Sequence, residues 1–158
     1  MNLHGWRLPR MLEWITRRRE TADIRLRVSN LTRHTVLASC AELADKGEKR
    51  RKGLLGRQQL LPGEGLWITP CEAVHTFGMQ FPIDLIYLDR DHCIRKVRSN
   101  VQPWRLSACL AAHSVLELRS GVIHDTHTMP GDKLEFSSAS LPDDGLHAFS
   151  CHALGVLE

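Results

Sequence analysis

The run Leu85-Ile86-Tyr87-Leu88 constrains the fold more than any other stretch of this sequence, because it is apolar at every position. A short apolar run between turn signals is typical of a β-strand that is covered on both faces. The polar segment 89–92 follows it, and residues 93–101 then supply a second strand-like segment. We therefore predict that 84–88 and 93–101 pair as a central antiparallel hairpin.

Other short strands are predicted along the chain, separated by turns that contain proline, glycine or asparagine. Residues 24–28 alternate between apolar and charged side chains, and 35–38 would be the return strand of a hairpin. The further predicted strands are 66–68, 115–118 and 133–136, and a helix is predicted over 48–56. This pattern favours a mainly β fold, either a β sandwich or a partly closed barrel, with one or two short helices. An α+β fold is the alternative.

The length of 158 residues fits one domain. We expect a single β-rich domain over 21–137, an N-terminal basic amphipathic extension over 1–20 and a C-terminal tail over 138–158. The extension combines tryptophans with the cluster Arg17-Arg18-Arg19. The favoured interpretation is a terminal helix that packs on its own domain or on a partner, and the alternative is contact of residues 6–19 with a membrane surface.

Charge and cysteine content narrow the class of protein. The formal net charge is only +3, so nucleic acid is not the partner that we expect. No run approaches the roughly 20 apolar residues of a membrane span. The five cysteines show no paired spacing, and charged residues interrupt the N-terminal apolar stretch, which argues against a signal peptide. We expect a cytoplasmic protein with reduced thiols, without a cofactor.

Several short motifs occur in order at moderate spacing. They are Arg50 with Gly53-Leu54-Leu55-Gly56-Arg57, Pro62-Gly63-Glu64-Gly65-Leu66, His75-Thr76-Phe77-Gly78-Met79, Pro82-Ile83-Asp84, Val115-Leu116-Glu117-Leu118 with Gly121, and Gly131-Asp132. Over about residues 24–136 this series resembles domain-of-unknown-function family 192, an uncharacterised bacterial and archaeal family. The resemblance implies a compact, mainly β single domain with one or two helices, and it implies no activity. The commonest family form has Phe-Trp-Met-Lys-Asn-Thr before its Pro-x-Asp, whereas this chain has Val74-His75-Thr76-Phe77-Gly78-Met79.

Two carboxylates lie beside or within predicted strands. Asp84 directly precedes the apolar run, so its side chain is expected to be buried and hydrogen-bonded to the 75–80 loop or to an arginine, Arg50 or Arg57. A structural role for Asp84 is favoured over a role as a site acid or base. Glu117 points to the face opposite from its neighbours Leu116 and Leu118, and that face is either solvent or the inside of a cleft.

Histidines and cysteines offer weaker candidates. A catalytic pair of Cys71 and His75 would require contact in space, and no flanking signature of a thiol enzyme accompanies it. The pairs Cys71/His75 and His124/His127 do not have the spacing of a familiar zinc site, so no metal is expected.

The leading hypothesis is a cleft around residues 75–84 that binds a small polar or anionic ligand, or a segment of a partner protein. Its predicted ligand-binding residues are Arg57, His75, Thr76, Met79 and Asp84, with Arg57 as the cation. The alternative is a hydrolase-like enzyme that uses Asp84 or His75 in acid–base chemistry. A third hypothesis is a scaffold that docks other proteins through its N-terminal helix. The sequence identifies no catalytic residue with certainty.

Overall fold

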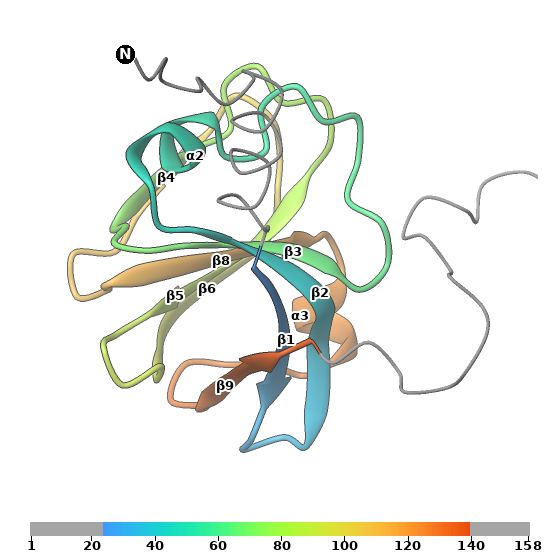
Figure 1. Cartoon of the computed structure of the whole chain (residues 1–158), viewed down its shortest axis with the longest axis vertical. Helices are drawn as coiled ribbons and strands as arrows, with labels where there is room; N and C mark the ends of the chain where they lie inside the picture. The colour runs from blue at the N-terminus through green and yellow to red at the C-terminus, as the bar shows by residue number, and fades with distance from the viewer. Residues whose placement is uncertain (1–23, 140–158) are drawn as a thin grey trace, which may run out of the picture.

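A computed structural model of the chain describes residues 24–139 (Figure 1). The predicted extension over 1–20 and nearly all of the predicted tail lie outside the described residues. The described part is mostly β-strand, with a seven-stranded sheet in the order β6-β5-β8-β3-β2-β1-β9, a separate two-stranded sheet of β4 and β7, and two short helices. This agrees with the predicted mainly β fold.

The large sheet begins with the predicted N-terminal hairpin. Strands β1 (Arg25–Asn30) and β2 (Thr35–Ala44) pair antiparallel, and β9 (Leu134–Ser138) adds to the other side of β1. Strand β2 then pairs with β3 (Glu64–Ile68) in parallel. A parallel pair requires a crossover connection, and here α2 (Gly47–Lys52) lies within it. The predicted helix over 48–56 is too long, because Gly53 and Gly56 have positive φ angles of 50° and 82° and end the helix in turns.

The predicted hairpin of 84–88 and 93–101 is confirmed as β5 (Ile83–Leu88) and β6 (Ile94–Val101), which pair antiparallel. Its predicted central position is wrong. Strand β6 is an edge strand, because β5 pairs on its other side with β8 (Ser114–Arg119), and β8 with β3. Every residue of β5 is buried, as the apolar run predicted.

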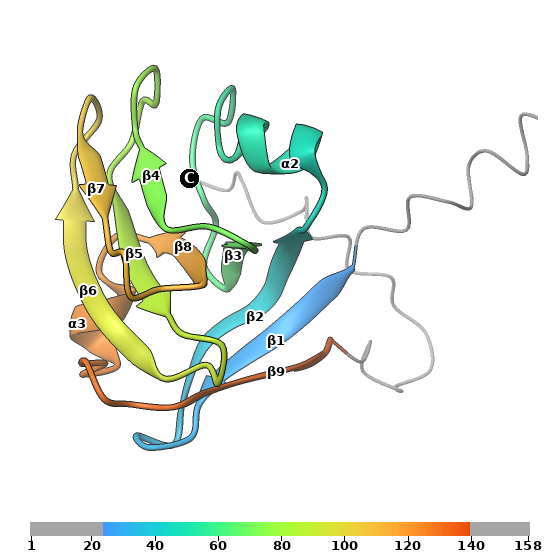
Figure 2. The ribbon, with the colours of Figure 1, turned by 90° about the vertical axis from the view of Figure 1, so that its left-hand side faces the viewer.

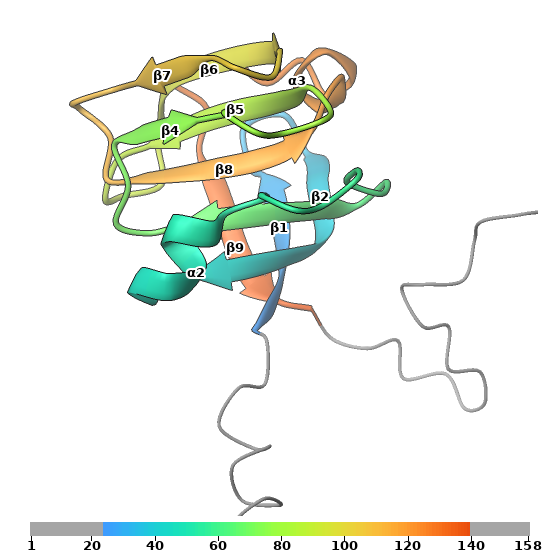
Figure 3. The same ribbon diagram turned by 90° about the horizontal axis from the view of Figure 1, so that it is seen from above.

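The large sheet curls so that its two ends approach each other (Figures 2 and 3). Backbone hydrogen bonds join the start of β6 to the segment before β9: the amide of Ile94 donates to the carbonyl of Asp132 at 2.8 Å, and the amide of Leu134 donates to the carbonyl of His92 at 3.0 Å. The structure is therefore a partly closed barrel. One apolar cluster fills the inside of the curl and includes Ile86, Leu116 and Leu118.

A second apolar cluster lies on the other face of the large sheet. There, Leu66, Leu85 and Val115 pack with residues from α2 and the segments that follow it, and with Val74 of the small sheet. The small sheet consists of β4 (Ala73–His75) and β7 (Leu106–Ala108), and neither segment is among the strands predicted from the sequence. Strands of three residues are too short to show a periodicity of two.

Asp84 connects three parts of this fold. It is fully buried on the inside of the curl, where its carboxylate accepts hydrogen bonds from the backbone amides of Asn100 (2.8 Å), Gly121 (3.1 Å) and Ile123 (2.8 Å). Gly121 adopts a left-handed φ of 102° at the start of α3 (Val122–Asp125), a conformation that favours glycine. The prediction of a buried, hydrogen-bonded Asp84 is confirmed, but the predicted partners are wrong: the donors are backbone amides outside the 75–80 loop, and none belongs to an arginine side chain.

These contacts predict a structural effect of Asp84→Asn. An amide has one acceptor oxygen, so its NH2 group would face a backbone donor, and the lost bonds involve a charged acceptor. We expect the free energy of unfolding to fall by about 2–4 kcal/mol. Urea denaturation measures this, with Asp91→Asn as the control, because Asp91 is an exposed aspartate at the β5–β6 turn. A change equal to that of Asp91→Asn would contradict a structural role.

Candidate functional site

A small cavity of about 80 Å³ lies between α2, the segment after it, and β4. Three basic residues at the end of α2 line it together with apolar side chains and one acid. The lining residues are Arg50, Arg51, Lys52, Gly53, Leu54, Leu55, Ile68, Cys71, Ala73, Val74, His75, Met79 and Glu117. The cavity therefore combines cations from α2 with apolar walls, and its acid comes from the large sheet.

Glu117 is the acid, and its position follows from strand geometry. In β8 it lies directly opposite Leu85 of β5 and Leu66 of β3, so its side chain shares their face of the large sheet. The α2 connection and the small sheet cover that face. The alternative that Glu117 faces a cleft, which the sequence left open, is therefore the one that the structure shows.

The carboxyl group of Glu117 lacks the partners that a buried acid usually has. The residue is only 3% exposed, and none of the described residues hydrogen-bonds its Oε2 atom. Burial raises the pKa of Glu117 from 4.5 to about 8, although the positive charge of Arg57 acts against the rise. Glu117 is thus mostly protonated at neutral pH and can donate a hydrogen bond from a site that lies against a cavity.

Further polar groups lie close to Glu117. Burial raises the pKa of the Tyr87 hydroxyl, and the charges of Cys71, Cys109 and Glu117 raise it further. The hydroxyls of Tyr87 and Ser107 are buried and make no hydrogen bond to described residues. Burial likewise raises the pKa of Cys71, which argues against a reactive thiolate there. Cys71, Cys93 and Cys109 are free thiols, and Cys151 lies outside the described residues.

The structure separates the five predicted ligand-binding residues. His75 and Met79 line the cavity. Asp84 lies opposite Leu118, on the face inside the curl, so it does not share a site with His75 and the two cannot act as an acid–base pair. Arg57 lines an adjoining hollow, where its Nη2 atom is 2.8 Å from Oε1 of Glu42.

Thr76 has a structural position. Its hydroxyl donates to the carbonyl of Gln102 at 2.8 Å and accepts from the amide of Arg105 at 2.9 Å, and its side chain is buried. These bonds hold the loop between β6 and β7 against the end of β4. Thr76 therefore positions other residues and does not line the cavity.

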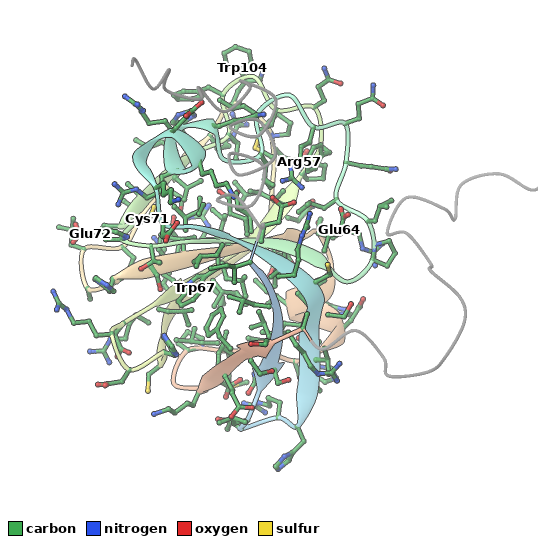
Figure 4. The ribbon with its side chains drawn as sticks, viewed as in Figure 1. Arg57, Glu64, Trp67, Cys71, Glu72 and Trp104 are labelled. Carbon is green, nitrogen blue, oxygen red and sulfur yellow. The ribbon has the colours of Figure 1, made fainter. Side chains whose placement is uncertain are left out.

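Sequence reasoning did not place Arg50 at the cavity. Arg50 lines the cavity, and its Nη1 atom is 3.4 Å from the carbonyl oxygen of Pro70. Burial raises the pKa of Cys71, and the charge of Arg50 opposes that rise. The membership of Arg50 in a basic cluster gave no indication of its place at the cavity, because such clusters are usually solvated. Figure 4 shows Cys71 and Glu72 beneath α2.

The described residues contain no cluster of three or more histidine, cysteine or acidic side chains that could hold a metal ion. The rings of His124 and His127 lie 6.4 Å apart on α3 and the turn after it, and both residues are exposed. Within residues 24–139 no helix is long and apolar enough to cross a membrane.

Comparison with solved structures shows the same fold in other proteins. A protein from Sinorhizobium meliloti 1021, described as a putative transcription regulator, is 25% identical with a TM-score of 0.64, and the match covers 73% of this chain and 94% of that one. A protein of unknown function from Novosphingobium aromaticivorans is 23% identical with a TM-score of 0.62, covering 72% and 84%. No curated protein matches this chain.

The strongest comparison is with a protein family. The model of domain-of-unknown-function family 192, described as "Uncharacterized ACR", matches residues 28–136, which include the second half of β1, the cavity, Asp84 and most of β9. The family resemblance drawn from the short motifs is thereby confirmed. The chain belongs to domain-of-unknown-function family 192.

Proposed function

We propose that the domain binds the acid group of a small anionic ligand in the cavity between α2 and β4. The observation that carries this proposal is the Oε2 atom of Glu117, which is buried against the cavity and has no partner among the described residues. A buried polar atom without a partner lowers stability, and a ligand that accepts its hydrogen bond removes that penalty.

The charge of the cavity favours an anion. Arg50, Arg51 and Lys52 line it, and the one acid in its wall is neutral over most of the physiological range. A cationic ligand would have to approach these three positive charges. An anion gains an ion pair with Arg50 and accepts a hydrogen bond from the protonated Glu117.

The size of the cavity limits what it encloses. At about 80 Å³ it lies well below the roughly 300–1,000 Å³ of sites that surround a whole drug-sized ligand. A carboxylate or phosphate group fits this description, with the remainder of the ligand outside. The apolar walls, which include Leu55, Val74 and Met79, would contact the carbon atoms next to the acid group.

The raised pKa of Glu117 predicts a stability effect with a definite sign. The folded state holds the proton up to about pH 8, whereas the unfolded state releases it near pH 4.5. Between these values the folded state binds more protons, so the free energy of unfolding falls as pH rises and levels off above pH 8.

Glu117→Gln removes this titration. Its free energy of unfolding, relative to that of the natural protein, should rise across the window by on the order of 4 kcal/mol. Urea denaturation at a series of pH values measures the difference. Glu135→Gln, at an exposed glutamate of β9, is the control. Its free energy of unfolding should depend on pH in the same way as that of the natural protein. If the free energy of unfolding of Glu117→Gln also depends on pH in the same way as that of the natural protein, Glu117 is ionised in the folded state at neutral pH.

A ligand titration tests the proposal itself. Acetate and inorganic phosphate are added to the isotopically labelled protein, and amide chemical shifts around the cavity report binding. Arg50→Met and Glu117→Met should each weaken binding about tenfold or more, because each removes a charge-assisted or buried hydrogen bond. Glu117→Gln should retain binding, since its amide also donates, and should abolish the loss of affinity above pH 8 that we expect for the natural protein.

Arg90→Gln is the matched control for Arg50→Met, because Arg90 is an exposed arginine at the distant β5–β6 turn. Equal binding by the Arg50 and Arg90 variants, or shifts confined to residues outside the cavity lining, would contradict the proposal.

A further inference from the structure

Next to the cavity, aromatic and aliphatic side chains project from the small sheet and its loops. The aromatic loop patch consists of His75, Phe77, Trp104 and Leu106, and all four residues are exposed. Phe77 is 45% exposed, Trp104 66% and Leu106 70%, which is unusual for such large apolar groups. His75 and Leu106 are paired directly across β4 and β7, so they share the outer face of the small sheet.

The patch is held in a fixed arrangement. The ring of His75 stacks on that of Phe77, with centroids 5.3 Å apart and planes at 20°, and Phe77 lies 6.0 Å from Trp104. Thr76 fixes both loops, because its carbonyl accepts from the amide of Trp104 at 3.0 Å while its hydroxyl bonds to Gln102 and Arg105. Trp104 has a left-handed φ of 62°, a strained conformation for a bulky residue. Such strain is more often found at functional sites than elsewhere.

Positive charge surrounds the patch. Arg105 follows Trp104, and its Nη1 atom donates to the Trp104 carbonyl. The basic turn of α2, with Arg50, Arg51 and Lys52, lines the same cavity as His75. The two loop segments 75–82 and 102–106 contain no acidic residue, and α2 contains only Glu48. The end of the molecule that carries the patch is therefore both apolar and cationic.

The shape of this end distinguishes between partners. The loops after β4 and β6 project at the same end as α2 (Figure 2), and Trp104 lies at the extremity of the molecule (Figure 4). Projecting side chains suit a soft surface that they can enter, whereas a peptide segment is usually held in a groove. The rings already stack on each other and a leucine lies beside them, which is less suited to stacking of nucleic-acid bases.

We propose that the aromatic loop patch is a membrane-contact surface that binds bilayers containing anionic lipids. Phe77, Trp104 and Leu106 would enter the interface between headgroups and acyl chains, where amphipathic rings are favoured. Arg105 and the basic turn of α2 would contact the lipid phosphates and carboxylates. The surface is formed by the folded domain itself, and it is distinct from the predicted extension over residues 1–20.

Vesicle sedimentation with the full chain tests this. Vesicles of phosphatidylcholine alone and of phosphatidylcholine mixed with phosphatidylserine are compared at low and high salt. We expect binding to the mixed vesicles, weakened by salt because the charge contacts are exposed. The double variant Phe77→Ala/Trp104→Ala should lower the partition coefficient on the order of tenfold or more. Arg105→Gln, which keeps the rings, should lower it by about fivefold.

Leu31→Ala is the matched control, since Leu31 is also 45% exposed but lies in the turn between β1 and β2. It should bind as the natural protein does. Thermal unfolding of each variant shows whether it is folded. If the double variant is unfolded, Arg105→Gln alone provides the test. The proposal is overturned if the natural protein does not sediment with the mixed vesicles, or if the Arg105 variant and a folded double variant bind normally. Binding of a single-stranded oligonucleotide is measured as well. If the variants lose that binding but bind vesicles as the natural protein does, the patch is a nucleic-acid surface and the proposal is overturned.

Discussion

The constraint on which the rest of this structure depends is that β5 and β8 lie in a sheet covered on both faces. Side chains of adjacent strand residues point to opposite faces, so a polar residue within these strands is buried on whichever face it lies, and only Arg119 at the end of β8 is exposed. Two acids occur there, Asp84 in β5 and Glu117 in β8, and they lie on opposite faces. One face is the inside of the curl, and the other lies beneath α2 and the small sheet. Their different surroundings give the two acids different roles.

The fold supplies hydrogen-bond donors to the carboxylate of Asp84, but it supplies none to the Oε2 atom of Glu117 among the described residues. Three backbone amides donate to Asp84, from the end of β6 and from the start of α3, so its charge is compensated by groups that no side-chain substitution can remove. Among the described residues, the charge of Arg57 is the one influence that opposes the rise in the pKa of Glu117, and Glu117 is mostly neutral at pH 7 as a result. A carboxylate held by amides is a structural element, whereas a neutral acid beside a cavity is a hydrogen-bond donor available to another molecule.

Much of the fold was predictable from local pattern. The apolar run of β5 and the alternation of β1 specified strands, and the position of Asp84 beside the run specified its burial. Its partners could not be predicted, because Asn100, Gly121 and Ile123 approach it only through sheet pairing and the left-handed turn at Gly121. The strands β4 and β7 are too short to produce a signal in the sequence.

The candidate site was harder to predict for the same reason. Alternation along β8 gave the face of Glu117 but not what covers that face, which depends on the crossover through α2 and on the small sheet. The predicted cleft around 75–84 was drawn from residues close in sequence. Of these, His75 and Met79 do line the cavity, while Thr76 holds two loops together and Asp84 lies behind the sheet. Residues that are close in sequence lie in different parts of the fold here, because His75 ends β4 whereas Asp84 belongs to β5 of the other sheet.

The composition of the cavity wall bears on the role that we propose for Glu117. Its nearest partners across the sheet are Leu66 and Leu85, and both belong to a continuous apolar cluster in which a methionine or leucine at position 117 would pack. A buried acid in such surroundings destabilises the folded state at neutral pH, since the unfolded chain releases the proton and the folded domain retains it. Packing alone would not favour a glutamate at this position. The anion site that we propose provides a reason, because an anion beside Arg50 would need a donor on the sheet side of the cavity, and a neutral acid would supply one without repelling it.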